Sequence, residues 1–303
     1  MSFREAQLSK SSYPSASAVL ELFKPITWFP PMWAFACGVV SSGMSLSEHW
    51  LTVLLGVLLT GPLVCATSQA VNDWFDRHVD AINEPDRPIP SGRVPGRWGL
   101  YIGIIWSGVS LVVAAYLGTV VLCAAIVGLL LAWAYSAPPF RLKQNAWYGY
   151  AACGACYEGL PWITGAAVML AGALPDARIF IVAALYSIGA HGIMTLNDFK
   201  AIEGDKALGL KSLPVLMGSE RAARFACWVM ALPQMAVVAF LLYWQLPLAA
   251  LLVGASLVAQ VGCMRRFMTD PLKFAPWYNA TGVSLYVLGM MATAVALRSV
   301  ISA

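Results

Sequence analysis

Long apolar runs dominate this sequence and constrain its fold more than any other feature. A helix needs about 20 consecutive apolar residues to cross a bilayer, and such runs recur from Trp28 to Ile301. Only 11% of the residues are Asp, Glu, Lys or Arg, whereas a soluble domain carries about 25%. The chain therefore cannot cover a water-facing surface, and we predict an all-α, polytopic membrane protein.

The apolar runs predict nine transmembrane helices in a single helical bundle. Residues 1–27 are expected to form a cytoplasmic N-terminal tail, and residues 28–303 the transmembrane domain. The predicted helices are Trp28–Met44, Trp50–Val71, Gly99–Gly118, Thr119–Ser136, Ala146–Ala171, Ile179–Asn197, Ala222–Trp244, Leu246–Met264 and Thr281–Ile301.

The basic residues support this helix count and indicate an orientation. With nine spans, seventeen of the nineteen Lys and Arg residues fall on one side of the membrane, and only Arg178 and Arg298 on the other. Basic loops stay in the cytoplasm, so we expect the N-terminus and the large loops inside and the C-terminus outside. The net charge of +4 follows from these flanking residues, and no nucleic-acid partner is expected.

One polar stretch, VNDWFDRHVDAINEPDRPIPSGRV from Val71 to Val94, holds five of the fifteen acidic residues. Side chains three, four and seven positions apart share a helix face. If the second predicted helix continues two turns past Val71, Asn72, Asp73, Asp76 and Asp80 form an acidic ridge at its end. Like charges at this spacing repel one another, so cations are expected between them.

A second acidic cluster follows the sixth predicted helix, in LNDFKAIEGDKALGLKSLPV. Both clusters open with an apolar residue followed by Asn, Asp and an aromatic, which indicates a weak internal repeat around a shared site. Carboxylates suit Mg²⁺, which completes its shell with water and substrate phosphate, and basic side chains could hold the remaining phosphate oxygens. A diphosphate with a lipid tail fits this combination, although charged juxtamembrane loops are also common. The basic candidates are Lys24, Arg87, Arg93, Arg141, Lys143, Lys206 and Lys211.

Three motifs resemble those of the UbiA-type intramembrane prenyltransferases. NDWFDRHVDAINEPDRPIPSGRV is similar to their first acidic motif, DFKAIEGDKALGLKSLPV to the second, and YSAPPFRLKQNAWYG to the segment that places a Tyr and a Lys near the diphosphate. The resemblance implies a nine-helix bundle with an Mg²⁺-lined cavity that faces the cytoplasm. One position departs from it, because many relatives carry an acid where this chain has Ala201.

Within that family, LFKPITWFPPMWAFACGVVSSG most resembles the branch that makes bacteriochlorophyll and chlorophyll, and WFPPMWAF favours the bacteriochlorophyll side. The resemblance implies transfer of a geranylgeranyl or phytyl group from its diphosphate to the propionate of bacteriochlorophyllide, or of chlorophyllide. It also implies a bacterial inner, photosynthetic intracytoplasmic membrane and pigment-handling protein partners.

The resemblance also implies roles for individual residues. Asn72, Asp73, Asp76 and Asp80 would bind one Mg²⁺, and Asp198, Glu203 and Asp205 a second. Lys24, Arg87, Arg141 and Lys143 would hold the leaving group, and Tyr135 would face the bond that breaks. Asp76, Asp80, Tyr135 and Lys143 form the expected catalytic set, with Arg93, Lys206 and Lys211 binding substrate.

Two polar residues interrupt apolar helices. Glu158 lies near the middle of the fifth predicted helix, where an acid is costly and usually functional, and we expect it to face the cavity near the acceptor. His191 lies about two turns before Asp198. It either ligates the central metal of the pigment or is a hydrogen-bonded histidine of the bundle.

Two other functions fit parts of the sequence. Transporters also contain intramembrane acids and internal repeats, but their sites lie near the membrane midplane, whereas these acids lie at helix ends. A prenyltransferase for a quinone-precursor aromatic acid or for haem is the alternative within the enzyme class.

Overall fold

The structure, a computed structural model, describes residues 13–207 and 209–301, and its elements in these ranges are helical. The first half contains α1 (Ala16–Leu22), η1 (Pro25–Thr27), α2 (Phe29–Ser41), α3 (Leu46–Leu58), η2 (Leu59–Cys65), α4 (Ala66–Asn83), α5 (Trp98–Leu117), α6 (Thr119–Ser136) and η3 (Leu142–Gln144). The second half contains α7 (Ala146–Gly154), η4 (Ala155–Gly159), α8 (Leu160–Met169), α9 (Ala177–Asp198), η5 (Phe199–Ala201), α10 (Ile202–Ala207), α11 (Leu213–Met217), α12 (Ser219–Tyr243), α13 (Pro247–Phe267) and α14 (Pro271–Ile301).

The chain is an integral membrane protein. Within the described ranges, seven helices are long and apolar enough to cross a bilayer. The other two predicted spans correspond to α2, which has 13 residues, and to the helix from Ala146 to Met169, whose mean hydropathy is lower than that of the seven. The all-α bundle is confirmed, and the count of nine spans stays a prediction.

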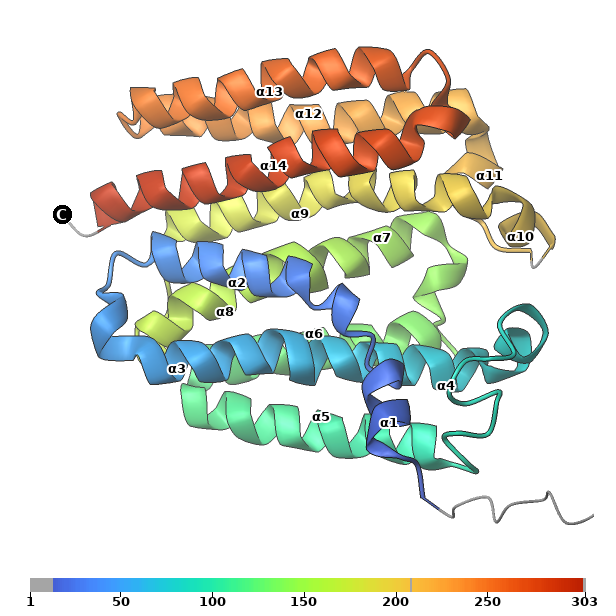
Figure 1. The fold of residues 1–303 in the computed structure, drawn as a ribbon. Helices are drawn as coiled ribbons and strands as arrows, with labels where there is room; N and C mark the ends of the chain where they lie inside the picture. Colours follow the sequence, from blue (N-terminus) through green and yellow to red (C-terminus); the bar gives the residue numbers. More distant parts are fainter. Residues whose placement is uncertain (1–12, 208, 302–303) are drawn as a thin grey trace, which may run out of the picture.

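The helices lie side by side in a bundle whose two ends differ (Figure 1). At one end α4 and α9 finish, and the loop of residues 84–97 and the short helices α10 and α11 extend beyond them (right in Figure 1). We call this the loop end. The described C-terminus lies at the opposite end. The two acidic segments therefore share one end of the molecule, as the predicted topology requires.

The segment expected as a tail is partly folded against the bundle. Ser15 caps α1 through its side chain, and Leu22 and Phe23 are buried in a small core with Ala66 and Ala70 of α4. This packing brings Lys24 next to the acidic ridge. Arg4 and Lys10, which we assigned to the basic side, lie outside the described residues.

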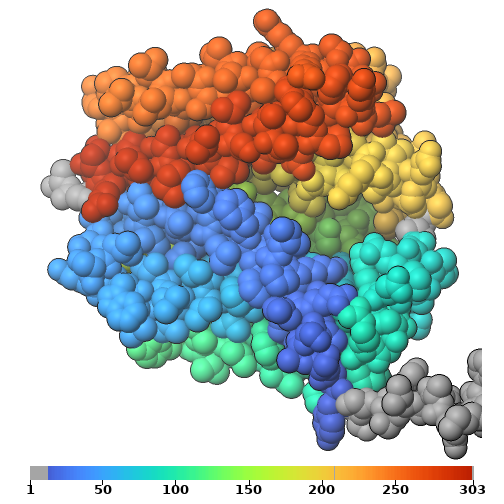
Figure 2. All heavy atoms as spheres, in the orientation of Figure 1, coloured from blue at the N-terminus to red at the C-terminus, as the bar shows by residue number. Residues whose placement is uncertain are grey.

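Two glycines let α2 and α8 pack with their backbones in contact. A Cβ atom on Gly165 would lie 2.1 Å from the carbonyl oxygen of Phe35, and one on Gly38 would lie 2.0 Å from that of Trp162. Small residues permit such close approach between membrane helices. The contact fixes the position of α2, whose first turn lines the cavity described below. Figure 2 shows the packed surface of the bundle, with the blue N-terminal segment below the orange and red C-terminal one and green atoms of the middle segment between them.

Replacing Gly165 by Ala should destabilise this contact, because the new methyl group meets backbone atoms that cannot rotate away. We expect a loss of about 1–3 kcal/mol, seen as a lower midpoint of thermal unfolding in detergent. Gly254→Ala in α13 is the matched control, since a Cβ there meets nothing within 4 Å. Equal midpoints for the two variants would contradict the close packing.

Candidate active site

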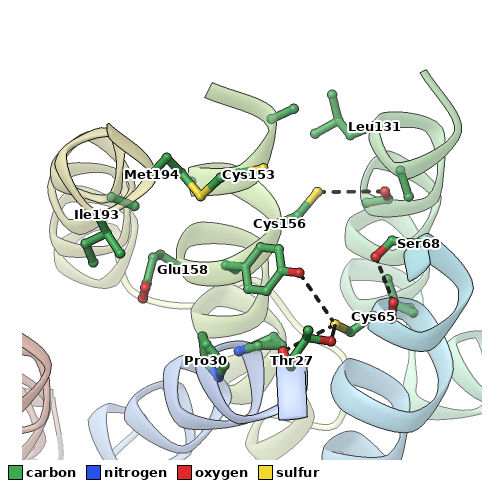
Figure 3. A pocket seen from close by; sticks show the side chains of 18 of the residues that line it. Thr27, Pro30, Cys65, Ser68, Leu131, Cys153, Cys156, Glu158, Ile193 and Met194 are labelled. Atoms are coloured by element: carbon green, nitrogen blue, oxygen red, sulfur yellow. Dashed lines mark hydrogen bonds between the residues drawn. The ribbon is translucent and has the colours of Figure 1, made fainter. Parts of the chain in front are cut away.

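An apolar cavity of about 510 Å³ lies inside the bundle, within the range of roughly 300–1,000 Å³ typical of small-molecule sites. Its walls come from α2, η2, α4, α6, the helix from Ala146 to Met169, α9 and α14. Figure 3 shows that hydrocarbon and sulfur atoms form most of the lining, with few polar atoms. The cavity therefore suits a ligand that is largely apolar.

Two π-helical turns aim polar side chains into this cavity. In η2, Pro62 lacks the N–H that an α-helix would use, and the widened turn presents Thr60 and Cys65. In η4, the widened turn presents Tyr157 and Glu158. Single π turns inside α-helices are frequent at functional sites, and here both open onto one cavity.

The two Asn-Asp motifs meet at this cavity. Asn72 and Asn197, the first residue of each motif, both line it. The Asn72 amide donates to Ser136 Oγ at 3.1 Å, and Asn279 donates to Asn197 Oδ1 at 2.8 Å. The weak sequence repeat thus has a structural counterpart, because each half supplies the same residue type to the lining of one cavity.

The acidic ridge forms as its spacing predicts. Helix α4 continues to Asn83, so Asp73, Asp76 and Asp80 lie along one face. Asp73 and Asp80 are buried, and the Asp76 side chain is 22% exposed. Oδ2 of Asp73 is buried without a hydrogen-bond partner. A buried, unpaired carboxylate oxygen is costly, which suggests that it belongs to a site that accepts a further ligand.

Each carboxylate of the ridge contacts a cation, as we expected from their mutual repulsion. Lys24 Nζ lies 2.6 Å from Asp73, Arg87 lies 2.9 Å from Asp80, and Lys143 lies 2.5 Å from Asp76. Arg141 is 3.9 Å from Asp76. These four cations are the ones predicted to hold the leaving group.

Two of these four cations have an unusual backbone conformation, and the other two have shifted pKa values. Lys24 and Arg141 have φ of 45° and 40°, a region that is costly for residues other than glycine and is tolerated mainly at functional sites. Burial lowers the pKa of Lys143, although Asp76 acts in the opposite direction. Burial also disfavours the charged form of Arg87, but Asp73 and Asp80 more than offset this and raise its pKa.

The second acidic cluster is looser. Asp198 ends α9 and accepts a short hydrogen bond from the hydroxyl of Tyr150, and that hydroxyl also accepts from the Leu213 amide at 3.3 Å. On α10, Glu203 is exposed and Asp205 is partly buried. Lys206 and Lys211 are exposed. These side chains lie at the loop end but do not line the cavity.

Four other predicted residues differ in their placement. Tyr135 and Glu158 line the cavity. Arg93 instead forms an ion pair with Glu21 on the surface. His191 is outside the cavity lining, and its Nδ1 lies 3.1 Å from the carbonyl oxygen of Ile188. Both expected roles of His191 stay predictions, because a contact at Nδ1 leaves Nε2 able to ligate a metal.

Divalent metal binding fits the chemistry of the ridge but requires its contacts to change. The donors are oxygen atoms, which Mg²⁺ prefers, and the unpaired Oδ2 of Asp73 is suited to a cation. In the described ranges, however, no three His, Cys, Asp or Glu side chains are already grouped to hold a metal. The protein's own lysines and arginines neutralise these carboxylates instead.

Several site residues escaped prediction. Tyr150, the partner of Asp198, is one of many aromatics in apolar runs, and nothing in the sequence distinguishes it. Gln69, which donates to the Tyr157 hydroxyl at 3.2 Å, had a usable signal, because it lies three residues before Asn72 on the same helix face. Asn197, by contrast, was part of the second predicted cluster through its match to Asn72 in the repeat, and it lines the cavity.

The chain is similar to known proteins in both sequence and fold. The model of the UbiA prenyltransferase family matches residues 27–297. The chain is 57% identical to the bacteriochlorophyll synthase 33 kDa chain of Cereibacter sphaeroides over 96% of both chains. It is 40% identical to the chloroplastic chlorophyll synthase of Oryza sativa subsp. japonica, over 91% of this chain and 76% of that one. A solved structure of a UbiA homolog from Archaeoglobus fulgidus bound to GPP and Mg²⁺ has the same fold, with a TM-score of 0.70, 20% identity and coverage of 89% of this chain and 99% of that one.

Proposed function

The chain belongs to the UbiA prenyltransferase family, and from this premise we propose that it esterifies bacteriochlorophyllide. A geranylgeranyl or phytyl group is transferred from its diphosphate to the propionate carboxylate, and bacteriochlorophyll is the product. The observation that carries this proposal is the 57% identity to a bacteriochlorophyll synthase over 96% of both chains.

The loop end supplies the groups that a leaving diphosphate requires. Lys24, Arg87, Arg141 and Lys143 point toward one acidic ridge, so an entering diphosphate can take these cations over from the carboxylates. The carboxylates so released are Asp73, Asp76 and Asp80, and with Asn72 they would hold Mg²⁺. Asp198, Glu203 and Asp205 would hold a second ion from the side of α9 and α10. When bound, Mg²⁺ neutralises charge on the departing diphosphate.

The cavity supplies shelter for the reactive tail. Breaking the allylic C–O bond develops positive charge on the prenyl carbon, which water would trap. Aromatic faces stabilise cations, and Phe29, Trp33, Tyr135 and Tyr157 line the cavity. The propionate is ionised at neutral pH and attacks the allylic carbon directly, so the protein needs no strong general base. The cavity-lining residues keep water out and hold the propionate and the allylic carbon in place.

We place the loop end in the cytoplasm. Nearly all Lys and Arg residues fall on that side in the predicted topology, and basic loops remain inside. The membrane would be the bacterial inner, photosynthetic intracytoplasmic membrane, with the C-terminus in the periplasm. Pigment-handling proteins are expected partners, because both pigment and product are poorly soluble in water.

Chlorophyllide is the second candidate acceptor, favoured by the 40% identity to a chlorophyll synthase. The test is a transfer assay on membranes that contain the protein, with Mg²⁺ and geranylgeranyl diphosphate. Bacteriochlorophyllide, chlorophyllide and 4-hydroxybenzoate are offered separately, and pigment esters are separated by chromatography. We expect the highest kcat/KM with bacteriochlorophyllide. Product on 4-hydroxybenzoate alone would exclude the pigment reaction, and no product on any acceptor would contradict the proposed function.

A further inference from the structure

Glu158 is the one acidic or basic residue in the lining of the described cavity. Its side chain is buried, with 5% of the residue exposed, and Oε2 has no hydrogen-bond partner. In the view of Figure 3, its carboxyl group lies on the side of Pro30, Ile193 and Met194, away from Cys65 and Ser68 of the opposite wall. None of the steps described above uses this group.

The surroundings of Glu158 determine what it can bind. Neither Lys, Arg nor His is among the described cavity-lining residues, so no cation compensates a negative charge there. An isolated carboxylate in apolar surroundings is very costly, and the neutral carboxyl is the form that such a wall tolerates. A neutral carboxyl group carries one O–H donor and remains an acceptor. It therefore suits an uncharged ligand group that accepts a hydrogen bond.

The two substrates differ in whether they offer such a group. Beyond its diphosphate, a prenyl chain is hydrocarbon and would leave the Glu158 carboxyl unpaired. The rim of a bacteriochlorophyllide ring carries carbonyl oxygens, and these can accept the hydrogen bond. A buried donor left unpaired costs free energy, so the wall that contains Glu158 favours the ring over the tail.

We propose that Glu158 is a recognition residue for the tetrapyrrole, donating a hydrogen bond to a carbonyl oxygen at the rim of the ring. The apolar faces of Pro30, Ile193 and Met194 pack against the ring beside it. The prenyl chain occupies the opposite wall, near Cys65 and Ser68. This inference rests on the proposed function and goes further by assigning each substrate to a wall of the cavity.

The test measures binding of each substrate apart from catalysis. Purified protein in detergent, without Mg²⁺ and without prenyl diphosphate, is titrated with bacteriochlorophyllide, and the change in pigment absorbance gives Kd. Glu158→Leu should weaken pigment binding about tenfold or more, because a hydrogen bond to a buried partner is lost. Glu158→Gln keeps an N–H donor and should stay within a few-fold of wild type. Neither change should alter the Kd for geranylgeranyl diphosphate, measured separately with Mg²⁺ present.

Folding is checked by thermal unfolding of the same samples. Replacing an unpaired buried polar group by an apolar one of similar size is near neutral or stabilising, so Glu158→Leu should unfold at or above the wild-type midpoint. Glu158→Met serves as a second apolar variant if Leu fails to fold. Unchanged pigment affinity in both apolar variants, or weaker diphosphate binding, would overturn the assignment. If wild-type protein neither binds nor esterifies the pigment, the proposed function itself fails.

Discussion

Asp76→Asn should lower kcat for prenyl transfer by about a hundredfold or more, since charge stabilisation at a leaving group is among the largest catalytic effects. The Asp76 carboxylate lies at the centre of the ridge, with Lys143 at 2.5 Å and Arg141 at 3.9 Å. Neutralising it would remove a proposed metal ligand and would leave two cations without their anion. The substitution keeps the shape of the side chain, so the bundle should fold normally. Ester formation in membranes, normalised to protein content, measures the effect.

The control for Asp76→Asn is Asp86→Asn. Asp86 is an exposed acid in the loop of residues 84–97, at the same end of the bundle, and the chemical change is identical. We expect its activity to stay within a factor of about two of wild type, as for most exposed substitutions. An equal loss in both variants would point to the net charge of the loop end, and near wild-type activity of Asp76→Asn would remove Asp76 from the metal site.

Lys143→Gln should raise KM for the prenyl diphosphate about ten- to a hundredfold, because a charge-assisted hydrogen bond contributes roughly 1.5–3 kcal/mol. Its side chain is 14% exposed and its ammonium group lies 2.5 Å from Asp76, and burial lowers its pKa. An incoming diphosphate offers it a stronger anion than Asp76 does. KM for the pigment should change little, because pigment and diphosphate contact different parts of the site.

Lys273→Gln provides the comparison for this lysine. Lys273 is exposed near the start of α14 at the loop end and contacts the ring of Phe274. The substitution Lys273→Gln removes the same charge from the same end of the bundle, but it does not alter a contact of the acidic ridge. A similar rise of KM in both variants would mean that the basic loops attract the diphosphate only through their overall field.

The features that the sequence predicted best are the acidic ridge and its need for cations. The helical spacing of Asp73, Asp76 and Asp80 predicted a ridge on one face, and α4 forms it. Their mutual repulsion predicted cations between them, and Lys24, Arg87 and Lys143 occupy those positions. The ridge follows from local geometry and the need for cations from Coulomb repulsion, whereas the packing of the bundle brings in Lys24 and Lys143 from 49 and 67 positions away.

The features that escaped prediction depend on distant contacts. Tyr150 donates to Asp198 across 48 positions, and Arg93 pairs with Glu21 across 72. Such pairings follow from how the helices pack, which apolar periodicity does not determine. Glu158 and His191 look alike in the sequence, because each is a polar residue that interrupts an apolar run. Only the structure shows that His191 lies near a backbone carbonyl oxygen, while Glu158 has an unpaired oxygen at the cavity.

The central claim is that the propionate carboxylate attacks the allylic carbon while the diphosphate leaves. An isotope measurement tests it most directly. Bacteriochlorophyllide labelled with ¹⁸O in both propionate oxygens is converted with unlabelled geranylgeranyl diphosphate and Mg²⁺, and the ester is analysed by mass spectrometry. Our account predicts that both labelled oxygens remain in the ester, because the C–O bond that breaks belongs to the diphosphate. Loss of one label would show that the carboxyl group is activated and attacked instead, and would contradict the mechanism.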